Sequence, residues 1–192
     1  MNARDLKLVV TAALIGLGGL VAVPSAHAQI DTQLMQEFRN KAASLLSGYQ
    51  PRASNTQGLA AAHAVVSSRK VWVSAFNVPG QVPQASAGFE LAPLTVGGQF
   101  PGAKVTARFV VTERVGNKTR LFVAIYKNGS QVATKELPYV TQPGTFTLTT
   151  DPITLQAGAE YKAHAFVNVL VAGGESGVRG AVATIPEIKW EI

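Results

Sequence analysis

Apolar residues follow three different patterns along the 192-residue chain. Residues 8–23 form an almost unbroken apolar run that follows a basic start. Over residues 30–49 an apolar residue recurs every three or four positions, which is the period of one face of a helix. From residue 70 onward, short apolar or alternating segments are separated by glycine, proline and asparagine. The pattern therefore predicts a leader, a helix and a domain of strands joined by turns.

The predicted β domain covers residues 70–192. Residues 70–76 alternate between two sets of side chains, and Pro93 divides the next segment, 89–96, into an edge strand or two short pieces. Further strands are expected at 104–112, 120–126, 131–137, 145–149, 160–171 and 181–192. No clear helical pattern follows residue 70. We therefore predict a mainly β fold, an antiparallel β-sandwich of immunoglobulin-like or jelly-roll-like form with an N-terminal amphipathic helix.

A hairpin at the centre of this domain carries the strongest local signal. The pair Asn128-Gly129 separates the apolar run 120–126 from the looser alternation 131–137. Asn-Gly suits a type I′ turn, in which both central residues need a positive φ angle. The hairpin supports the prediction of a β fold. Its turn reverses the chain, and we expect no binding or catalytic role for the turn residues.

The helix is expected over residues 31–48. Asp31 or Thr32 can cap its start, Gly48 suits the position after its end, and Pro51 prevents its continuation. Such a helix packs on the β domain or covers a sheet edge, or it contacts another subunit or a surface. A homo-oligomer formed through this helix is one of the expected partners.

The segment 51–69 separates this N-terminal helix region, 29–50, from the β domain. Its residues 55–58 are typical of a linker, whereas 59–66 suits either a short alanine-rich helix or the approach to a strand. We assign 51–69 as a linker and leave these two alternatives open.

The first 28 residues have the parts of a secretory signal peptide. Arg4 and Lys7 precede the apolar run, and Ala26-His27-Ala28 provides small residues for cleavage after position 28. The run has about 16 residues, fewer than the ~20 of a membrane-spanning helix. An uncleaved anchor is the alternative. We expect a bacterial protein that is secreted, periplasmic or at the cell surface.

The amino-acid composition limits the classes of function that we expect for this protein. The chain has no cysteine, so its stability has to come from apolar burial rather than disulfides. The net charge is +6, but no basic run is longer than Arg69-Lys70. Nucleic-acid binding proteins gather basic residues into a patch or stripe, so no nucleic-acid partner is expected.

Three stretches of the β domain combine turn residues with an adjoining strand. Residues 101–106 open a strand with Pro-Gly, residues 123–132 contain the central hairpin, and residues 157–163 form a glycine-led late strand. These stretches resemble bacterial immunoglobulin-like or fibronectin-like modules of the cell-adhesion-related type. The helix and the strands before residue 100 have no counterpart in those modules. The resemblance implies an extracellular, non-catalytic module, and it transfers no functional residue.

The sequence shows no set of residues arranged for catalysis or for metal binding. Beyond the leader the histidines are His63 and His164 and the aspartates are Asp31 and Asp151. They show no metal-ligand spacing, and no Gly-x-Ser-x-Gly elbow is present. We predict no metal, no cofactor and no enzymatic activity. A hydrolase built on His164 and a carboxylate stays as a third hypothesis.

Aromatic residues are the remaining candidates for recognition, with Trp72, Tyr139 and Trp190 as the ligand-binding candidates. Tryptophan is the usual platform for a sugar ring, but both tryptophans lie in strand patterns and also suit the core or its rim. Trp190 shares a strand face with Ile188 and Ile192, which favours its burial.

Two functions follow from these patterns. The first is a secreted or periplasmic non-catalytic module for adhesion or ligand binding, with an extracellular protein or glycan as its partner. The alternative is a structural subunit of an extracellular fibre, pilus or virion-like assembly. The mass of the protein in solution separates them, because an assembly subunit forms large oligomers.

Overall fold

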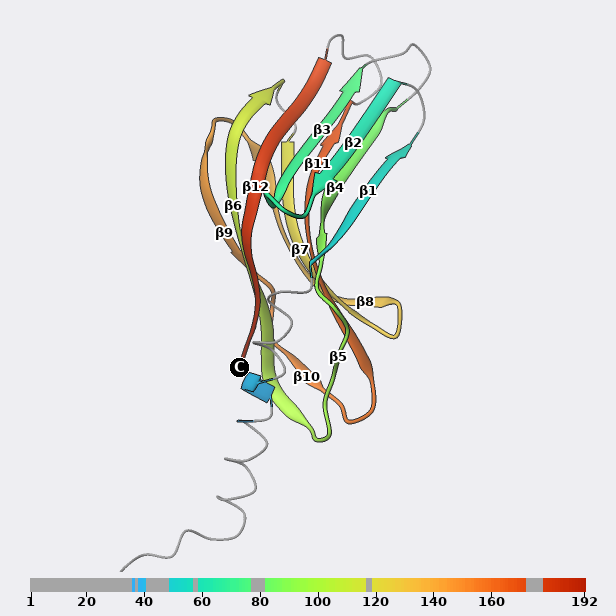
Figure 1. The fold of residues 1–192 in the computed structure, drawn as a ribbon, viewed down its shortest axis with the longest axis vertical. Coiled ribbons are helices and arrows are strands. Elements are labelled where there is room, and N and C mark those ends of the chain that lie inside the picture. The colour runs from blue at the N-terminus through green and yellow to red at the C-terminus, as the bar shows by residue number, and fades with distance from the viewer. Residues whose placement is uncertain are drawn as a thin grey trace, which may run out of the picture.

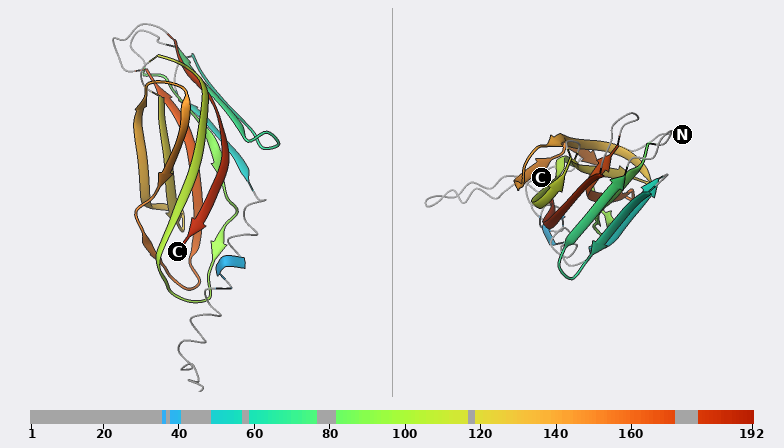
Figure 2. Two further views of the ribbon diagram at one scale, coloured as in Figure 1. Left: turned by 90° about the vertical axis from the view of Figure 1, so that its left-hand side faces the viewer. Right: turned by 90° about the horizontal axis from the view of Figure 1, so that it is seen from above.

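The computed structural model describes residues 36, 38–40, 49–56, 59–76, 82–116, 119–171 and 178–192. These residues form two antiparallel sheets that pack face to face (Figures 1 and 2). The first sheet has the order β1 (Gln50–Thr56), β4 (Gln84–Glu90), β11 (Glu160–Leu170), β7 (Thr119–Lys127) and β8 (Ser130–Val140), and β5 (Leu94–Thr95) pairs with β11. The mainly β prediction is confirmed, as two antiparallel sheets.

The second sheet contains the last strand at its centre. Its order is β10 (Ile153–Leu155), β6 (Phe100–Val115), β12 (Val178–Glu191), β3 (Lys70–Phe76) and β2 (Leu59–Val65), and β9 (Gly144–Thr149) pairs with β6. The long strands β6 and β12 therefore form the spine of this sheet.

The core lies between the two sheets and follows the alternation of the strands. In β3, Val71, Val73 and Ala75 are buried, whereas Trp72 and Phe76 are exposed. Successive side chains of a strand point to opposite faces, so β3 presents its small apolar residues to the core and its aromatic residues to the outside. Large buried side chains from both sheets complete the core: Phe89, Phe109, Leu121, Ile125, Tyr161 and Ile185.

The linker predicted over 51–69 is wrong. Residues 50–56 are β1, which pairs with β4, and residues 59–65 are β2, which pairs with β3. This stretch is poor in β-branched apolar residues, so its strand conformation comes from pairing with apolar neighbours rather than from local propensity. Ala60, Ala62 and Ala64 pack against the core, which decides the open alternative for 59–66 in favour of a strand.

The helix predicted over 31–48 lies mostly outside the described residues, as does the leader 1–28. Gln36 and residues 38–40 have helical backbone. Phe38 is buried, with its ring centroid 5.6 Å from that of Phe100 on β6. This contact places the apolar side of the short helical segment against the lower end of the sandwich (Figure 1).

The structure contains the predicted turn at Asn128-Gly129. Asn128 and Gly129 have φ angles of 48° and 84°, as a type I′ turn requires, and Lys127 pairs with Ser130. Pro93 lies between β4 and the two-residue β5, in agreement with the predicted division of 89–96. The short strand β10 was not predicted, and neither were residues 84–88 of β4, since the predicted strand began at Phe89.

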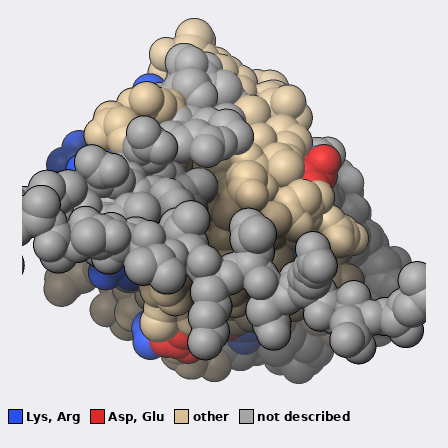
Figure 3. All heavy atoms as spheres, turned by 90° about the horizontal axis from the view of Figure 1, so that it is seen from below, with Lys and Arg blue, Asp and Glu red and all other residues tan. Residues whose placement is uncertain are grey.

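Figure 3 shows the molecule from below. Where described residues are visible there, small blue and red groups lie near the margins of a mostly tan surface. No helix among the described residues is both long and apolar enough to cross a membrane.

Candidate functional site

Trp72 lies on the outer face of the second sheet. It pairs with His63 on β2 and with Val182 on β12, and Val182 pairs in turn with Glu113 on β6. Directly paired residues of antiparallel strands have their side chains on the same face. The four residues therefore form one row across the outer face, in which the Trp72 side chain is 44% exposed.

Other large apolar side chains surround Trp72 on this face. Phe76 lies four residues further along β3 and pairs with Val178, and Val115 on β6 pairs with Gly180. All three large side chains are exposed. We call Trp72, Phe76, Val115 and Val178 together the Trp72 face. Apolar side chains that gather on an exposed surface mark binding sites, whereas single ones do not.

A shallow hollow of about 190 Å³ opens beside the Trp72 ring. Gly180 lies in its floor, and a Cβ atom there would come within 3.1 Å of the Val73 carbonyl oxygen. The absence of that side chain keeps the hollow open between β3 and β6. Its lining residues are Trp72, Ser74, Glu113, Arg114, Val115, Val178, Gly180, Ala181 and Val182.

A bulge in β6 turns Glu113 to the outer face. Val182 pairs with Glu113 but the next residue, Ala183, pairs with Val111, so Thr112 is an extra residue on β6. Phe109 and Val111 are buried, and unbroken alternation would place Glu113 inward with them. The Thr112 hydroxyl donates to the Val182 carbonyl at 3.2 Å and holds this geometry. The bulge therefore adds a carboxylate to the outer face beside Trp72.

The three aromatic candidates are not brought together. Tyr139 is 51% exposed and has a φ angle of 63°, but it lies on β8 at the edge of the other sheet. Trp190 is 5% exposed and belongs to the core. Its ring therefore has no open face for a surface ligand, and Trp72 is the candidate whose surroundings form a site.

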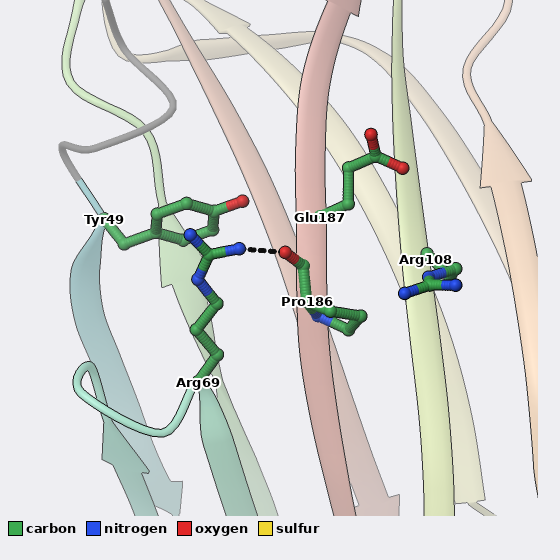
Figure 4. Close-up of a pocket in the computed structure, with 5 residues that line it drawn as sticks. All are labelled: Tyr49, Arg69, Arg108, Pro186 and Glu187. Carbon is green, nitrogen blue, oxygen red and sulfur yellow. Dashed lines mark hydrogen bonds between the residues drawn. The ribbon is translucent and has the colours of Figure 1, made fainter.

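A second hollow lies further along the same outer face, where β12 continues past the end of β3 (Figure 4). It measures about 450 Å³ and is lined by Tyr49, Arg69, Arg108, Pro186 and Glu187, and we call it the Arg69 pocket. The Tyr49 hydroxyl accepts a hydrogen bond from the Ile188 N–H at 2.8 Å. Burial raises the pKa of this hydroxyl above its usual value, against the opposing effects of the Ile188 N–H and the Arg69 charge.

The first sheet brings His164 and a carboxylate together. The His164 Nε2 lies 2.7 Å from the Glu90 Oε2, and the Lys162 Nζ lies 3.2 Å from the Glu90 Oε1. The Tyr126 ring covers the imidazole at a centroid distance of 4.4 Å. Glu90 is only 2% exposed, so its carboxylate is closed to solvent. This arrangement suits a buried ion pair, and it does not provide an open site for a substrate.

Metal ligation has no candidate in the part of the chain that the structure describes. No group of three or more histidine, cysteine, aspartate or glutamate side chains lies close enough together there to hold an ion. His63 is exposed on β2 in the row of Trp72, and it pairs across the strands with that tryptophan.

Sequence reasoning did not single out Glu113, and it did not find the Arg69 pocket. The bulge at Thr112 has no local sequence signature, and the residues of the Arg69 pocket come from four separate places in the chain. For Trp72, the alternation of residues 70–76 separates the two faces of the strand, but it does not indicate which face is covered.

Comparison with known proteins gives no family. No protein-family model and no curated protein sequence matches the chain. Among solved structures, the enzymatically active domain of tailspike protein 4 from bacteriophage CBA120 aligns with 75% of this chain and 19% of its own, at 15% identity and a TM-score of 0.37. The family 11 carbohydrate-binding module from Clostridium thermocellum aligns with 72% of this chain and 87% of its own, at 13% identity and a TM-score of 0.36. This chain thus spans about a fifth of the tailspike domain, and likeness of this degree assigns neither a family nor an activity.

Proposed function

We propose that this chain is an exported, non-catalytic β-sandwich module that binds a glycan on its Trp72 face. The observation that carries the proposal is the exposed Trp72 ring beside a hollow whose lining includes Glu113. An indole ring combines a broad apolar face with a polar edge, which suits the apolar face of a sugar ring. The Glu113 carboxylate, which lies in the same cross-strand row, can accept hydrogen bonds from sugar hydroxyls.

The size of the hollow supports a ligand that lies on the surface. Pockets that enclose a small molecule measure roughly 300–1,000 Å³, and the hollow beside Trp72 has about 190 Å³. A glycan chain extends past such a hollow and places only part of itself in it. A compact metabolite would remain largely exposed to water there.

The proposal includes two further points: the sandwich has a jelly-roll-like form, and the protein is exported. The neighbours β4-β11-β7-β8 in one sheet and β3-β12-β6-β9 in the other support a jelly-roll-like form, because consecutive strands repeatedly change sheet. The basic start, apolar run and small residues of positions 1–28 support export by a signal peptide. A location outside the cytoplasm is where a glycan-binding adhesion module would meet its ligand.

A glycan array followed by calorimetry tests the function. We expect the purified protein to bind a glycan, and Trp72→Ala to weaken that binding by roughly tenfold or more, equivalent to about 1.4 kcal/mol. Tyr139→Ala is the matched control, because it removes an equally exposed aromatic ring from the other sheet. Silence of the wild-type protein on the array, or equal binding by Trp72→Ala, would reject the proposal.

A structural subunit is the second candidate function, and an open side of the sandwich favours it. Within the described residues β8 pairs only with β7 and β9 only with β6, so both present a free edge. Between these edges lies a groove of about 380 Å³ lined by Lys135, Glu136, Leu137 and residues 145–149. A strand from another copy could pair with such an edge. Light scattering on the purified protein separates the candidates, because assembly requires large oligomers and a glycan-binding module does not.

A further inference from the structure

The Arg69 guanidinium is fixed in place before any ligand arrives. β3 begins at Lys70, which pairs with Thr184, so β12 has no β3 partner beyond that point. Arg69 takes over this role: its carbonyl accepts from the Ile185 N–H at 2.9 Å, and its Nη1 donates to the Pro186 carbonyl oxygen. Its guanidinium carbon also lies 4.5 Å from the centroid of the Tyr49 ring (Figure 4). A group held in this way loses little further freedom on binding.

The backbone explains why a proline stands at this position. Two residues of β12, Ile185 and Pro186, lie opposite the single residue Phe109 of β6. This is a β-bulge, one of the few places in a sheet where proline is tolerated, because proline cannot donate to the ladder. The bulge turns the Pro186 carbonyl towards Arg69 and opens the pocket between β12 and β6.

Arg108 supplies a second guanidinium on the other side of β12 (Figure 4). It is exposed, and it makes no hydrogen bond or ion pair with any residue that the structure describes. Its register partner Glu187 lies instead 3.7 Å from the Lys189 Nζ, which offsets the carboxylate charge. Two guanidinium groups and one partly offset carboxylate give the pocket a net positive character.

We infer that the Arg69 pocket binds the oxyanion of an acidic sugar, a carboxylate or a sulfate ester, in the same glycan that stacks on Trp72. This inference rests on the proposed function and deepens it to a ligand class. Guanidinium forks match planar or tetrahedral oxyanions with paired hydrogen bonds. The chain as a whole carries a net charge of +6, which favours the approach of a polyanion.

The two hollows are arranged for one extended ligand. Trp72 pairs with Val182, and Arg108 pairs with Glu187 on the same strand, so the two sites are about 15 Å apart at ~3.3 Å per strand residue. The exposed Lys70 lies between them on β3. An oligosaccharide running along β12 would therefore meet the ring, a lysine and the two arginines in sequence.

Matched acidic and neutral probes test this inference by calorimetry. The probes are hyaluronan, which carries only carboxylates, its carboxyl-reduced neutral form, dextran sulfate, which carries only sulfates, and unmodified dextran. We expect an acidic member to bind at least about tenfold more tightly than its neutral counterpart, and the preference to shrink as salt is added. Preference for hyaluronan or for dextran sulfate identifies the oxyanion as carboxylate or sulfate.

Variants then test which residues cause the tighter binding of acidic probes. Arg108→Gln should lower affinity for the acidic probe by roughly tenfold and leave any neutral binding unchanged, and Arg108→Lys should restore only part because lysine lacks the fork. Lys135→Gln on β8 is the charge-matched control. Arg108 is exposed on its strand, so the variant is expected to fold, and circular dichroism checks this.

The outcomes separate the two proposals. Equal affinity for acidic and neutral probes, or an acidic preference that Arg108→Gln leaves intact, overturns the inference while binding that depends on Trp72 still supports the glycan function. Binding to none of these probes or to any array glycan overturns both. An acidic preference lost in Arg108→Gln but unaffected by Trp72→Ala supports the oxyanion pocket and overturns the Trp72 platform.

Discussion

The hydroxyl of Tyr49 accepts a hydrogen bond from the backbone N–H of Ile188, 139 positions later in the chain, at 2.8 Å. Tyr49 stands immediately before β1 of the first sheet, and Ile188 lies in β12 of the second. The side chain thus provides the acceptor that a neighbouring strand would otherwise supply. One tyrosine connects the edge of one sheet to the central strand of the other.

Tyr49→Phe is expected to destabilise the protein by about 1 kcal/mol at neutral pH. The ring still fills its site, but the buried Ile188 N–H loses its acceptor, and an unpaired buried donor costs roughly 1–3 kcal/mol. Chemical denaturation of both proteins measures the difference. Equal midpoints with equal slopes would contradict the stabilising role of this hydrogen bond.

The stability that Tyr49 provides should decline at alkaline pH. Burial raises the pKa of its hydroxyl in the folded state, so above about pH 10 the unfolded chain releases a proton that the folded chain retains. Release from the unfolded state alone favours unfolding, so stability falls as the pH rises through this range. Below the unfolded pKa both states are protonated and the pH has no effect through this group. The difference in unfolding free energy between wild type and Tyr49→Phe should therefore shrink above pH 10, and a constant difference would contradict the assignment.

Gly88→Ala should be one of the most damaging small substitutions in the chain. A Cβ atom at position 88 would lie 2.0 Å from the Ala165 carbonyl oxygen and 2.8 Å from the Phe166 Cα, so β4 and β11 would have to separate. We expect a loss of about 3 kcal/mol, at the upper end for overpacking. Gly102→Ala is the comparison: the space there is open, and only the φ angle of 81° opposes the change, for about 1 kcal/mol. Thermal unfolding should rank the variants in this order, and the reverse ranking would contradict the packing argument.

Glu90→Gln tests whether the His164 cluster is structural. The substitution keeps the shape of the side chain and removes the charge that faces His164 and Lys162. Loss of one partner of a buried pair costs about 3–5 kcal/mol, and we expect about 2 kcal/mol here because Lys162 can turn towards solvent. Glycan binding should not change, since Glu90 lies in the opposite sheet from Trp72. Hydrolysis of an ester or glycoside substrate that disappears in Glu90→Gln would instead support the hydrolase hypothesis.

The sequence was sufficient for elements with a strong local pattern. Asn128-Gly129 determined a hairpin, and the alternation in residues 70–76 determined a strand and its two faces. It could not determine which face is covered, because Trp72 and Phe76 are compatible with either. The burial of Trp190 followed from the neighbouring Ile188, which is also in the core.

Other features depend on distant partners. β1 and β2 have little strand propensity, and they become strands because β4 and β3 are available to pair with them. Thr112 is an extra residue only with respect to the pairing of β6 with β12, so the bulge cannot be recognised from β6 alone. The Arg69 pocket likewise exists only after the turn before β3 meets the bulge in β12. None of these can be seen within a short window of sequence.

The central position of β12 also determines when this protein can fold. β3 and β6 do not touch as sheet neighbours, since β12 lies between them and pairs with both. A nascent chain therefore cannot close the second sheet, or form either hollow, before residues 178–191 have been synthesised. Until then it carries unpaired strands, and a chain in that state is prone to aggregate. The glycan binding proposed for the Trp72 face therefore requires β12 to take its place between strands made much earlier.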